Sequence, residues 1–325
     1  MKAVWYDRNG GSEVLTHGDL PTPTPGPGEV LVRLATSGVN PSDWKTRRGL
    51  SRPMAFPRVV PHSDGAGTIE AVGEGVDRAR IGERVWIWNG QWKRAFGTAA
   101  EYIALPAIQA VPLPENTSLE AGACLGIPAL TALHAVLTDG GVTGQTVLVT
   151  GGAGSVGHYA IQFARLLGAA RIITTISSEE KAAHALAAGA DETINYRTED
   201  VAGRVAALTG GAGVQRVVDV DLSGTAPLLP SLLAPGGLCA AYGSNGTEAT
   251  VQFGPAIMKG LAIRWFIVYE LNAAQRALAV DTLQAWLRAG LVKHAIAARV
   301  PLAQCAAAHD AVEAGRTIGN LVLDC

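Results

Sequence analysis

Residues 147–157 read VLVTGGAGSVG, an apolar stretch that runs directly into a glycine-rich turn. Residues 158–169, HYAIQFARLLGA, follow at once, and the spacing of their apolar side chains predicts an amphipathic helix. Gly152, Gly154 and Gly157 satisfy the pattern G-x-G-x-x-G. A strand, a turn of this pattern and a helix, in that order, predict a binding site for a dinucleotide pyrophosphate.

The three glycines have different expected tasks. Gly152 permits the tight turn, Gly154 lets backbone N–H groups approach the phosphates, and Gly157 lets the helix pack closely on its strand. The positive end of the helix dipole then faces the anion. The competing interpretation is a glycine turn that only connects a strand to a helix.

From about residue 120 onward, short apolar runs alternate with helical patterns, which predicts βαβ units and a doubly wound parallel sheet. The pattern weakens after about residue 262, where a helix over 273–289 and a last strand over 320–324 follow. The expected strands are 171–176, 192–196, 216–220 and 238–243, and the expected helices are 181–190 and 201–208.

The first third of the chain is β-rich instead. Residues 29–39 and 83–88 alternate apolar and polar side chains, and residues 65–76 combine strand and turn signals. We therefore expect two domains. A catalytic domain would comprise residues 1–122 and 263–325, and a nucleotide-binding domain residues 123–262.

The bulk properties narrow the possible partners and compartments. The 325 residues carry a net charge of −2, which gives no electrostatic footprint for nucleic acid or anionic lipid. Proline and glycine interrupt the uncharged run 222–247, so a membrane helix is not expected there. The four cysteines are far apart, and no signal-peptide pattern opens the sequence. These features predict a cytoplasmic protein with no membrane or nucleic-acid partner.

The residues after the second expected strand bear on the choice of nicotinamide cofactor. NAD sites place a carboxylate about 20 residues after the turn, to bind the ribose 2′-hydroxyl. Ile176 occupies that position, and Ser177, Ser178 and Lys181 follow as donors for a 2′-phosphate. The glutamates at 179–180 are expected to face solvent on the first helical turn. We predict NADPH, although Ser177 or Ser178 also suits a helix N-cap, and both roles can hold together.

Besides VLVTGGAGSVG, the sequence contains the segments GPGEVLVR, SGVNPSDWKTRRG, PHSDGAGTIEAVGEGV, PALTALHAV, INYRTED and GRTIGNLVL. Together these segments give the chain a resemblance to the medium-chain dehydrogenase/reductase superfamily. Within it, the chain resembles the zinc-independent quinone oxidoreductases that include zeta-crystallin. This resemblance implies a Rossmann domain that binds NADPH, a β-rich GroES-like catalytic domain, and a homodimer joined through sheet edges of the nucleotide domain.

The resemblance also bears on metal binding. Zinc alcohol dehydrogenases of this superfamily have a cysteine where this chain has Asn40 and a histidine where it has Ser63, and their third ligand falls near Gly126. His62 lies one residue away, but the sequence offers it no cysteine partner. Because a catalytic zinc needs three converging protein ligands, no metal is expected.

Without a Lewis acid, hydride transfer to a conjugated acceptor is easier to support than oxidation of a simple alcohol. The resemblance implies a quinone as the acceptor. An α,β-unsaturated carbonyl, or another activated alkene, is the alternative within the same class. A non-catalytic NADPH-binding or RNA-binding crystallin-like role is the alternative from another class.

The resemblance implies a set of cofactor contacts, with Asn40 beside the nicotinamide and Thr131 near its reactive end. Asn40 could instead cap a turn, and Tyr196 could be a core residue at a strand end. The other implied contacts are Gly154, Ser155 and Val156 at the pyrophosphate, Tyr196 with Ser178 and Lys181 at the 2′-phosphate, and Gly243, Ser244, Phe266, Ile267, Val268 and Asn320 around the nucleotide.

Lys45 marks a departure from the family pattern, because many related reductases have a tyrosine there. Its ammonium group could donate a proton to a reduced oxygen, or it could point to solvent. Asp43 is a weaker candidate, since a buried structural carboxylate explains it equally well. The expected catalytic residues are Asn40, Lys45 and Thr131.

Overall fold

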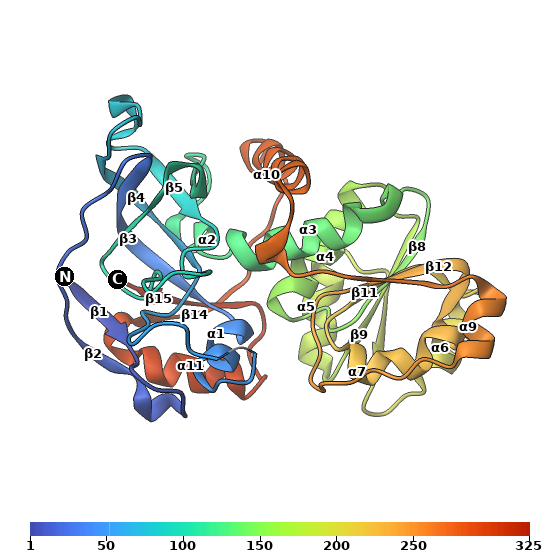
Figure 1. The fold of residues 1–325 in the computed structure, drawn as a ribbon. Helices are drawn as coiled ribbons and strands as arrows, with labels where there is room; N and C mark the ends of the chain where they lie inside the picture. Colours follow the sequence, from blue (N-terminus) through green and yellow to red (C-terminus); the bar gives the residue numbers. More distant parts are fainter. Residues whose placement is uncertain (52) are drawn as a thin grey trace. The chain divides into compact units, whose positions relative to one another are not determined.

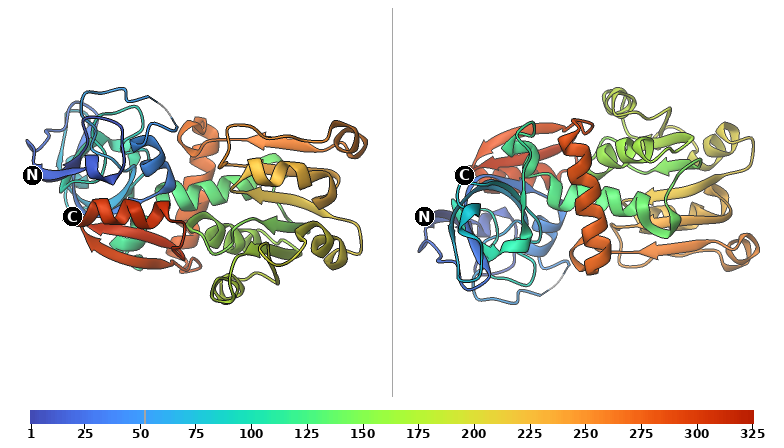
Figure 2. Two further views of the ribbon diagram at one scale, coloured as in Figure 1. Left: turned by 90° about the horizontal axis from the view of Figure 1, so that it is seen from below. Right: turned by 90° about the horizontal axis from the view of Figure 1, so that it is seen from above.

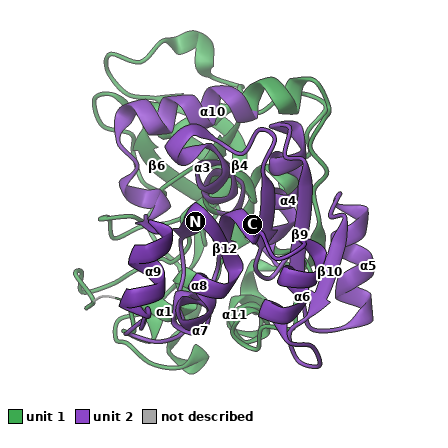
Figure 3. Cartoon of the chain, turned by 90° about the vertical axis from the view of Figure 1, so that its right-hand side faces the viewer, with its two compact units in different colours: residues 1–127, 284–325 green, residues 128–283 purple. Residues whose placement is uncertain are grey.

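The computed structural model describes residues 1–51 and 53–325 (Figure 1). The chain divides into unit 1, residues 1–127 and 284–325, and unit 2, residues 128–283 (Figure 3). These divisions fall at 127/128 and 283/284, whereas the sequence-based boundaries lie at 122/123 and 262/263. The domain boundaries therefore stay a prediction.

A six-stranded parallel sheet forms the centre of unit 2, in the order β10-β9-β8-β11-β12-β13. Numbered within the unit, this order is 3-2-1-4-5-6, which is the doubly wound arrangement that binds dinucleotides. The strands are β8 (Thr146–Val149), β9 (Arg171–Ile176), β10 (Glu192–Asn195), β11 (Val214–Asp219), β12 (Leu233–Ala241) and β13 (Ala262–Trp265).

Helices lie on both faces of this sheet (Figure 2). The inner strands β8, β9 and β11 are mostly buried, which explains why the sequence shows short, continuously apolar runs there rather than alternation. Leu148, Ile173 and Val217 belong to the core. The helices are α3 (Leu130–Leu137), α4 (Ser155–Leu166), α5 (Glu179–Ala187), α6 (Val201–Leu208), α7 (Leu222–Thr225), α8 (Leu229–Leu232) and α9 (Phe253–Lys259).

Strand β13 extends the sheet beyond the point where the sequence pattern weakens. It pairs in parallel with β12, with Ala262 opposite Leu238 and Trp265 opposite Ala241. The strand lies at one end of the sheet order, and most of its side chains are exposed. An edge strand of four residues that includes an arginine carries little apolar signal, so the sequence did not reveal it.

Unit 1 is built on a seven-stranded sheet in the order β14-β15-β3-β4-β5-β7, with β6 paired to β3. Strands β1 (Lys2–Trp5) and β2 (Thr16–Asp19) form a separate two-stranded antiparallel sheet near the start of the chain. The long strand β3 (Glu29–Val39) matches the predicted range, and Val30, Val32 and Leu34 are buried in one core cluster. The other strands are β4 (Asp64–Val72), β5 (Arg84–Ile87), β6 (Tyr102–Pro106), β7 (Ala110–Pro112), β14 (Ile296–Pro301) and β15 (Asn320–Asp324).

The helices of unit 1 are short. They are α1 (Pro41–Arg47), α2 (Leu119–Gly122) and α11 (Cys305–Glu313), while α10 (Ala273–Arg288) includes residues of both units. A π-helical segment, Leu125–Ala129, spans the first division between the units. Within residues 1–51 and 53–325, no helix is both long and apolar enough to cross a membrane.

Candidate dinucleotide site and its surroundings

The glycine-rich turn between β8 and α4 is close-packed at two of its three motif positions. A side chain at Gly152 would collide with Thr174, and one at Gly157 would collide with the Gly151 backbone. Gly154 is the N-cap residue of α4 and has an extended backbone, at φ −79° and ψ 170°. The turn and the helix–strand packing therefore require glycine at the first and third positions.

Two hydrogen bonds join the turn to the neighbouring strand β9. The Gly151 N–H donates to Thr175 Oγ1 at 3.0 Å, and the Gly152 N–H donates to the Thr175 carbonyl at 3.1 Å. Helix α4 begins at Ser155, and the first N–H groups of an α-helix have no acceptor within the helix. This end of α4 therefore offers donors and partial positive charge to an anion such as pyrophosphate.

The residues expected at the 2′-phosphate meet at the carboxyl ends of β9 and β10. Ile176 ends β9 and pairs with Asn195, and the Tyr196 N–H donates to the Ile176 carbonyl at 3.1 Å. Ser178 is the N-cap of α5, where its Oγ accepts from the Lys181 N–H at 3.3 Å.

Parallel strand order thus brings Ser177, Ser178, Lys181 and Tyr196 to one sheet edge. The N-cap role considered for Ser178 is confirmed. The core role considered for Tyr196 is wrong, because 52% of its side chain is exposed.

A pocket at the carboxyl ends of β12 and β13 contains four of the predicted nucleotide contacts, Gly243, Ser244, Phe266 and Ile267. Ser244 Oγ accepts from the Ser223 N–H at 3.3 Å and donates to the Gly246 carbonyl at 2.8 Å. Val268 is buried instead.

Helix α3 presents a buried polar face in the same unit. Thr131 is only 4% exposed, and His134 lies one turn later on the same side of the helix. The His134 ring stands edge-on to Phe266, with 4.6 Å between the ring centroids. Burial lowers the pKa of His134, which favours the neutral imidazole.

In unit 1, the Asn40 side chain bonds to a carboxyl that the sequence analysis did not single out. Asn40 Nδ2 donates to Asp64 Oδ2 at 2.9 Å, while the Asn40 N–H donates to Asp43 Oδ2 at 2.7 Å. Asn40 is thus the N-cap residue of α1, the alternative considered for it, and Asp43 is a buried carboxylate bonded to backbone, as its structural interpretation predicted. Asp64 is fully buried, and this burial raises its pKa well above the ordinary value. The sequence signal that could have revealed Asp64 is the DGAG motif, which begins with this residue.

The positions that hold the catalytic zinc of related alcohol dehydrogenases offer a poor donor set here. Asn40 supplies an amide, and Ser63 supplies a hydroxyl that accepts from the Gln91 N–H at 3.3 Å. Gly126 supplies no side chain, and a Cβ there would collide with Asp64. These three positions provide neither a thiolate nor an imidazole, the ligands that a zinc of that kind requires.

His62, in contrast, has the partners that the sequence did not reveal. Cys305 and His309, more than 240 residues away in the chain, lie beside it in the interior of unit 1. Burial lowers the pKa of His62 to about 3, so its imidazole is neutral at ordinary pH. The premise that His62 is isolated is therefore wrong.

Two other predicted residues of unit 1 have local partners. Lys45 is half-buried on α1, with its Nζ 5.7 Å from the centroid of the Trp44 ring. Asn320 is 4% exposed at the start of β15, and its Nδ2 donates to the Ala295 carbonyl at 3.2 Å.

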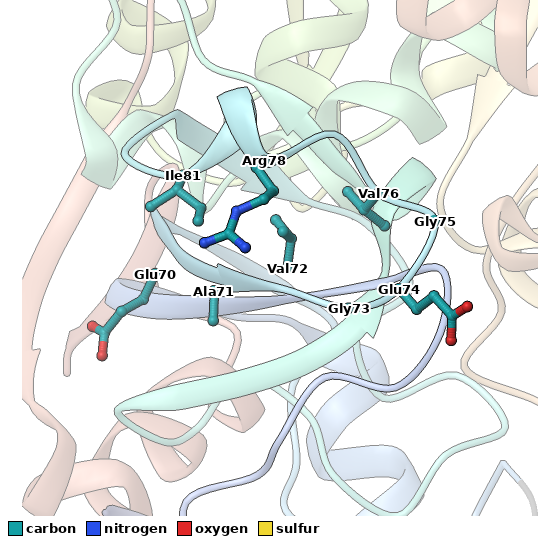
Figure 4. Close-up of a pocket in the computed structure, with 9 residues that line it drawn as sticks. All are labelled: Glu70, Ala71, Val72, Gly73, Glu74, Gly75, Val76, Arg78 and Ile81. Atoms are coloured by element: carbon teal, nitrogen blue, oxygen red, sulfur yellow. The ribbon is translucent and has the colours of Figure 1, made fainter.

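A separate pocket lies at the turn that follows β4 (Figure 4). Glu70, Glu74 and Arg78 are the charged residues of its lining. It contains none of the predicted site residues, so it contributes nothing to the nucleotide site.

The similarity of this chain to known proteins extends over its whole length. Residues 26–115 match the alcohol dehydrogenase GroES-like domain, and residues 155–284 match the zinc-binding dehydrogenase family. A quinone oxidoreductase of Pseudomonas aeruginosa is 34% identical over 99% of both chains. A 2-haloacrylate reductase of a Burkholderia species is 32% identical over 99% of this chain and 98% of its own.

The structure of the Escherichia coli quinone oxidoreductase complexed with NADPH superposes with a TM-score of 0.90. The two chains are 28% identical, and each is covered completely. The predicted architecture, a doubly wound parallel sheet plus a β-rich GroES-like part, is confirmed. This chain is therefore a member of the zeta-crystallin-like quinone oxidoreductase family within the medium-chain dehydrogenase/reductase superfamily.

Proposed function

We propose that this protein is an NADPH-dependent quinone oxidoreductase that transfers hydride to a quinone without a catalytic metal. The observation that carries the proposal is the shared carboxyl edge of β9 and β10. There Ile176 replaces the carboxylate of an NAD site, and Ser178, Lys181 and Tyr196, which follow the ends of these two adjacent strands, are the proposed donors to a 2′-phosphate. The relatives named as quinone oxidoreductases support the choice of acceptor.

The residues of unit 2 fit NADPH in their chemistry. The close-packed turn admits a pyrophosphate next to backbone N–H groups, and the hydroxyls and ammonium at the sheet edge suit a phosphate dianion. When bound, the reduced nicotinamide supplies the hydride. The proposed contacts in this unit are Thr131, Gly152, Gly154, Ser155, Val156, Gly157, Ser177, Ser178, Lys181, Tyr196, Gly243, Ser244, Phe266, Ile267 and Val268.

The proposed contributions of unit 1 are Asn40, Lys45 and Asn320. The hydrogen bond to Asp64 fixes the Asn40 amide, so that its remaining donor and its oxygen can orient a carboxamide or a carbonyl. Lys45 is the candidate proton donor to a reduced quinone oxygen. Because a quinone spreads charge over its π-system, hydrogen-bond donors suffice to stabilise it. The lack of thiolate and imidazole at the zinc-ligand positions supports metal-free turnover.

Steady-state kinetics of the full chain with 1,4-benzoquinone test this proposal. We expect kcat/KM with NADPH to exceed that with NADH by at least about tenfold, since each hydrogen bond to a charged phosphate contributes about 1.5–3 kcal/mol. Turnover should continue in the presence of a chelator. Equal kcat/KM values with NADPH and NADH would contradict the proposal. Loss of turnover in the presence of the chelator, while the protein is still folded, would also contradict it.

A reductase of activated alkenes is the second candidate. The similarity to a 2-haloacrylate reductase favours it, because a haloacrylate is an α,β-unsaturated acid. Parallel assays with a quinone, an enone and 2-chloroacrylate discriminate the two. A kcat/KM higher for either alkene than for the quinone would favour this candidate.

We also propose a homodimer and a cytoplasmic location. Trp265 on the edge strand β13 is 67% exposed. On helix α9, Phe253 is 77% exposed and Met258 is 87% exposed. A strand edge at the end of a sheet, with exposed aromatic and aliphatic side chains near it, is suited to pairing with a second copy about a two-fold axis. The four cysteines are free thiols, which is compatible with a reducing compartment.

A further inference from the structure

Three potential metal ligands converge in the interior of unit 1, and the proposed function uses none of them. His62 Nε2 lies 2.8 Å from His309 Nε2 and 3.9 Å from Cys305 Sγ. The ligand atoms of the three side chains all lie within 4.8 Å of one another. Two imidazole nitrogens and one sulfur form a donor set that Zn²⁺ prefers.

The fold places these ligands from two directions. Cys305 and His309 are four residues apart on α11, so both side chains project from the same face of that helix. His62 approaches from the segment before β4, with a left-handed backbone at φ +74°. A residue other than glycine in this conformation is uncommon, and it is retained where the surrounding structure requires it.

A chain of hydroxyl groups orients the His62 ring. Thr98 Oγ1 donates to the Asp64 carbonyl at 2.5 Å, and Ser37 Oγ lies 2.8 Å from Thr98 Oγ1 and 2.9 Å from His62 Nδ1. Since the Thr98 hydrogen is already used, Ser37 donates to Thr98 and accepts from the His62 Nδ1–H. This tautomer leaves the lone pair of His62 on Nε2, directed at His309, and such support by outer hydrogen bonds is typical of metal-binding histidines.

Burial also suits a metal site that is closed to solvent. His62, Cys305 and His309 are at most 1% exposed. Asp43, Cys325 and Arg47 are the charged groups that act on Cys305, and Glu313 pairs with Arg47 at 3.2 Å and with Arg48 at 2.6 Å. A Zn²⁺ ion with one thiolate adds a single positive charge. The Asp43 carboxylate opposes this charge, while the Glu313 carboxylate opposes the charges of the two guanidinium groups.

We propose that His62 Nε2, Cys305 Sγ and His309 Nε2 bind one structural Zn²⁺ ion, which fastens α11 to the segment before β4. Binding releases the thiol proton to solvent and shifts the His309 proton from Nε2 to Nδ1, so that the ion has three protein ligands. Nitrogens bound to one tetrahedral zinc lie about 3.3 Å apart, so the two rings must separate by roughly half an ångström. The proposed ion is not the catalytic zinc of related alcohol dehydrogenases. Asn40, Ser63 and Gly126, which occupy the positions of that zinc's ligands, do not bind it.

Cobalt titration of the untagged full chain tests the proposal. We expect the chelator-treated protein to bind one equivalent of Co²⁺, with a thiolate-to-cobalt charge-transfer band and the intense visible bands of low coordination. Zn²⁺ should displace the cobalt and raise Tm. Cys305→Ser should abolish the charge-transfer band, whereas Cys239→Ser, which removes a buried thiol of unit 2, should retain it.

The wild-type protein decides the question even if Cys305→Ser does not fold. If His62 and His309 form only a hydrogen bond and bind no metal, titration with Co²⁺ should give no thiolate band and Zn²⁺ should not change Tm. Either result would overturn the proposal. Binding of Cu⁺ but of neither Zn²⁺ nor Co²⁺ would also overturn it, since the site would then select a monovalent ion. Retention of the band in Cys305→Ser would assign the metal elsewhere.

Discussion

Asn40 Nδ2 donates to Asp64 Oδ2 at 2.9 Å and so connects the end of β3 to the start of β4. Both side chains are buried, at 3% and 0% exposure. Burial also raises the pKa of Asp64, so the neutral carboxyl is favoured there. The bond holds the Asn40 side chain in one rotamer. Its amide is the group proposed to orient the substrate or the nicotinamide.

Asn40→Ala should weaken both the fold and the reaction. The free energy of unfolding at pH 7 should fall by about 1–3 kcal/mol, because the variant leaves a buried oxygen of Asp64 without its donor. The kcat/KM for the quinone should fall as well, as the proposed orienting group is lost. Urea unfolding and steady-state rates measure the two effects. Asp64→Asn, which keeps an acceptor for Asn40, is the control and should lose less stability.

Lys181→Ala should lower kcat/KM for NADPH by about ten- to a hundredfold and leave the value for NADH unchanged. The reason is the loss of one charge-assisted contact to the 2′-phosphate, a group that NADH lacks. Glu180→Gln, on the exposed side of the same helical turn, is the matched control. An equal loss with both cofactors would place Lys181 away from the phosphate.

Gly157→Ala should destabilise the free protein by roughly 1–3 kcal/mol, because the new Cβ would overlap the Gly151 backbone. At Gly154 the nearest atom, the Gly151 carbonyl oxygen, lies 3.3 Å from the added Cβ, so Gly154→Ala should cost less stability. Both variants should bind NADPH more weakly. Thermal unfolding and fluorescence titration separate the two effects, and equal stabilities of the two variants would contradict the packing argument.

The nucleotide-binding half was predictable because its signals are local. The turn at 151–157 and the capped helix after Ile176 each lie within one short segment, and parallel pairing then brings Tyr196 to the same edge. The sequence could not reveal the His62 cluster, whose members are more than 240 residues apart and meet only through the fold. Asp64 was missed for a related reason. Its hydrogen-bond partner, Asn40, lies 24 residues earlier, after a different strand.

Asp139→Asn should give a pH-dependent loss of stability. The bidentate Arg264 guanidinium holds the pKa of Asp139 at about 2, below the ordinary 3.8. Because the folded-state pKa is lowered, the stabilisation is complete above about pH 4 and is lost as the pH falls through 2. Both side chains are partly exposed, so the effect at pH 7 should stay below about 1 kcal/mol. Asparagine tolerates the left-handed backbone at residue 139, at φ +50°.

Urea unfolding of wild type and Asp139→Asn between pH 7 and pH 2 checks this prediction. The difference between the two proteins should shrink below pH 4 and be small by pH 2, where Asp139 of the folded protein is about half protonated. A difference that stays constant over this range would show that it arises from the backbone or from packing rather than from the ion pair.

Trp265→Glu should convert the proposed dimer to a monomer. Trp265 lies on the edge strand β13 with 67% of its side chain exposed, and the substitution would bring two like charges together at a two-fold interface. Ile108→Glu changes a comparably exposed apolar side chain of unit 1, at 77%, and should leave the assembly intact. Sedimentation equilibrium measures both variants against wild type. A monomeric wild type, or a dimer that Trp265→Glu does not weaken, would exclude pairing through this edge.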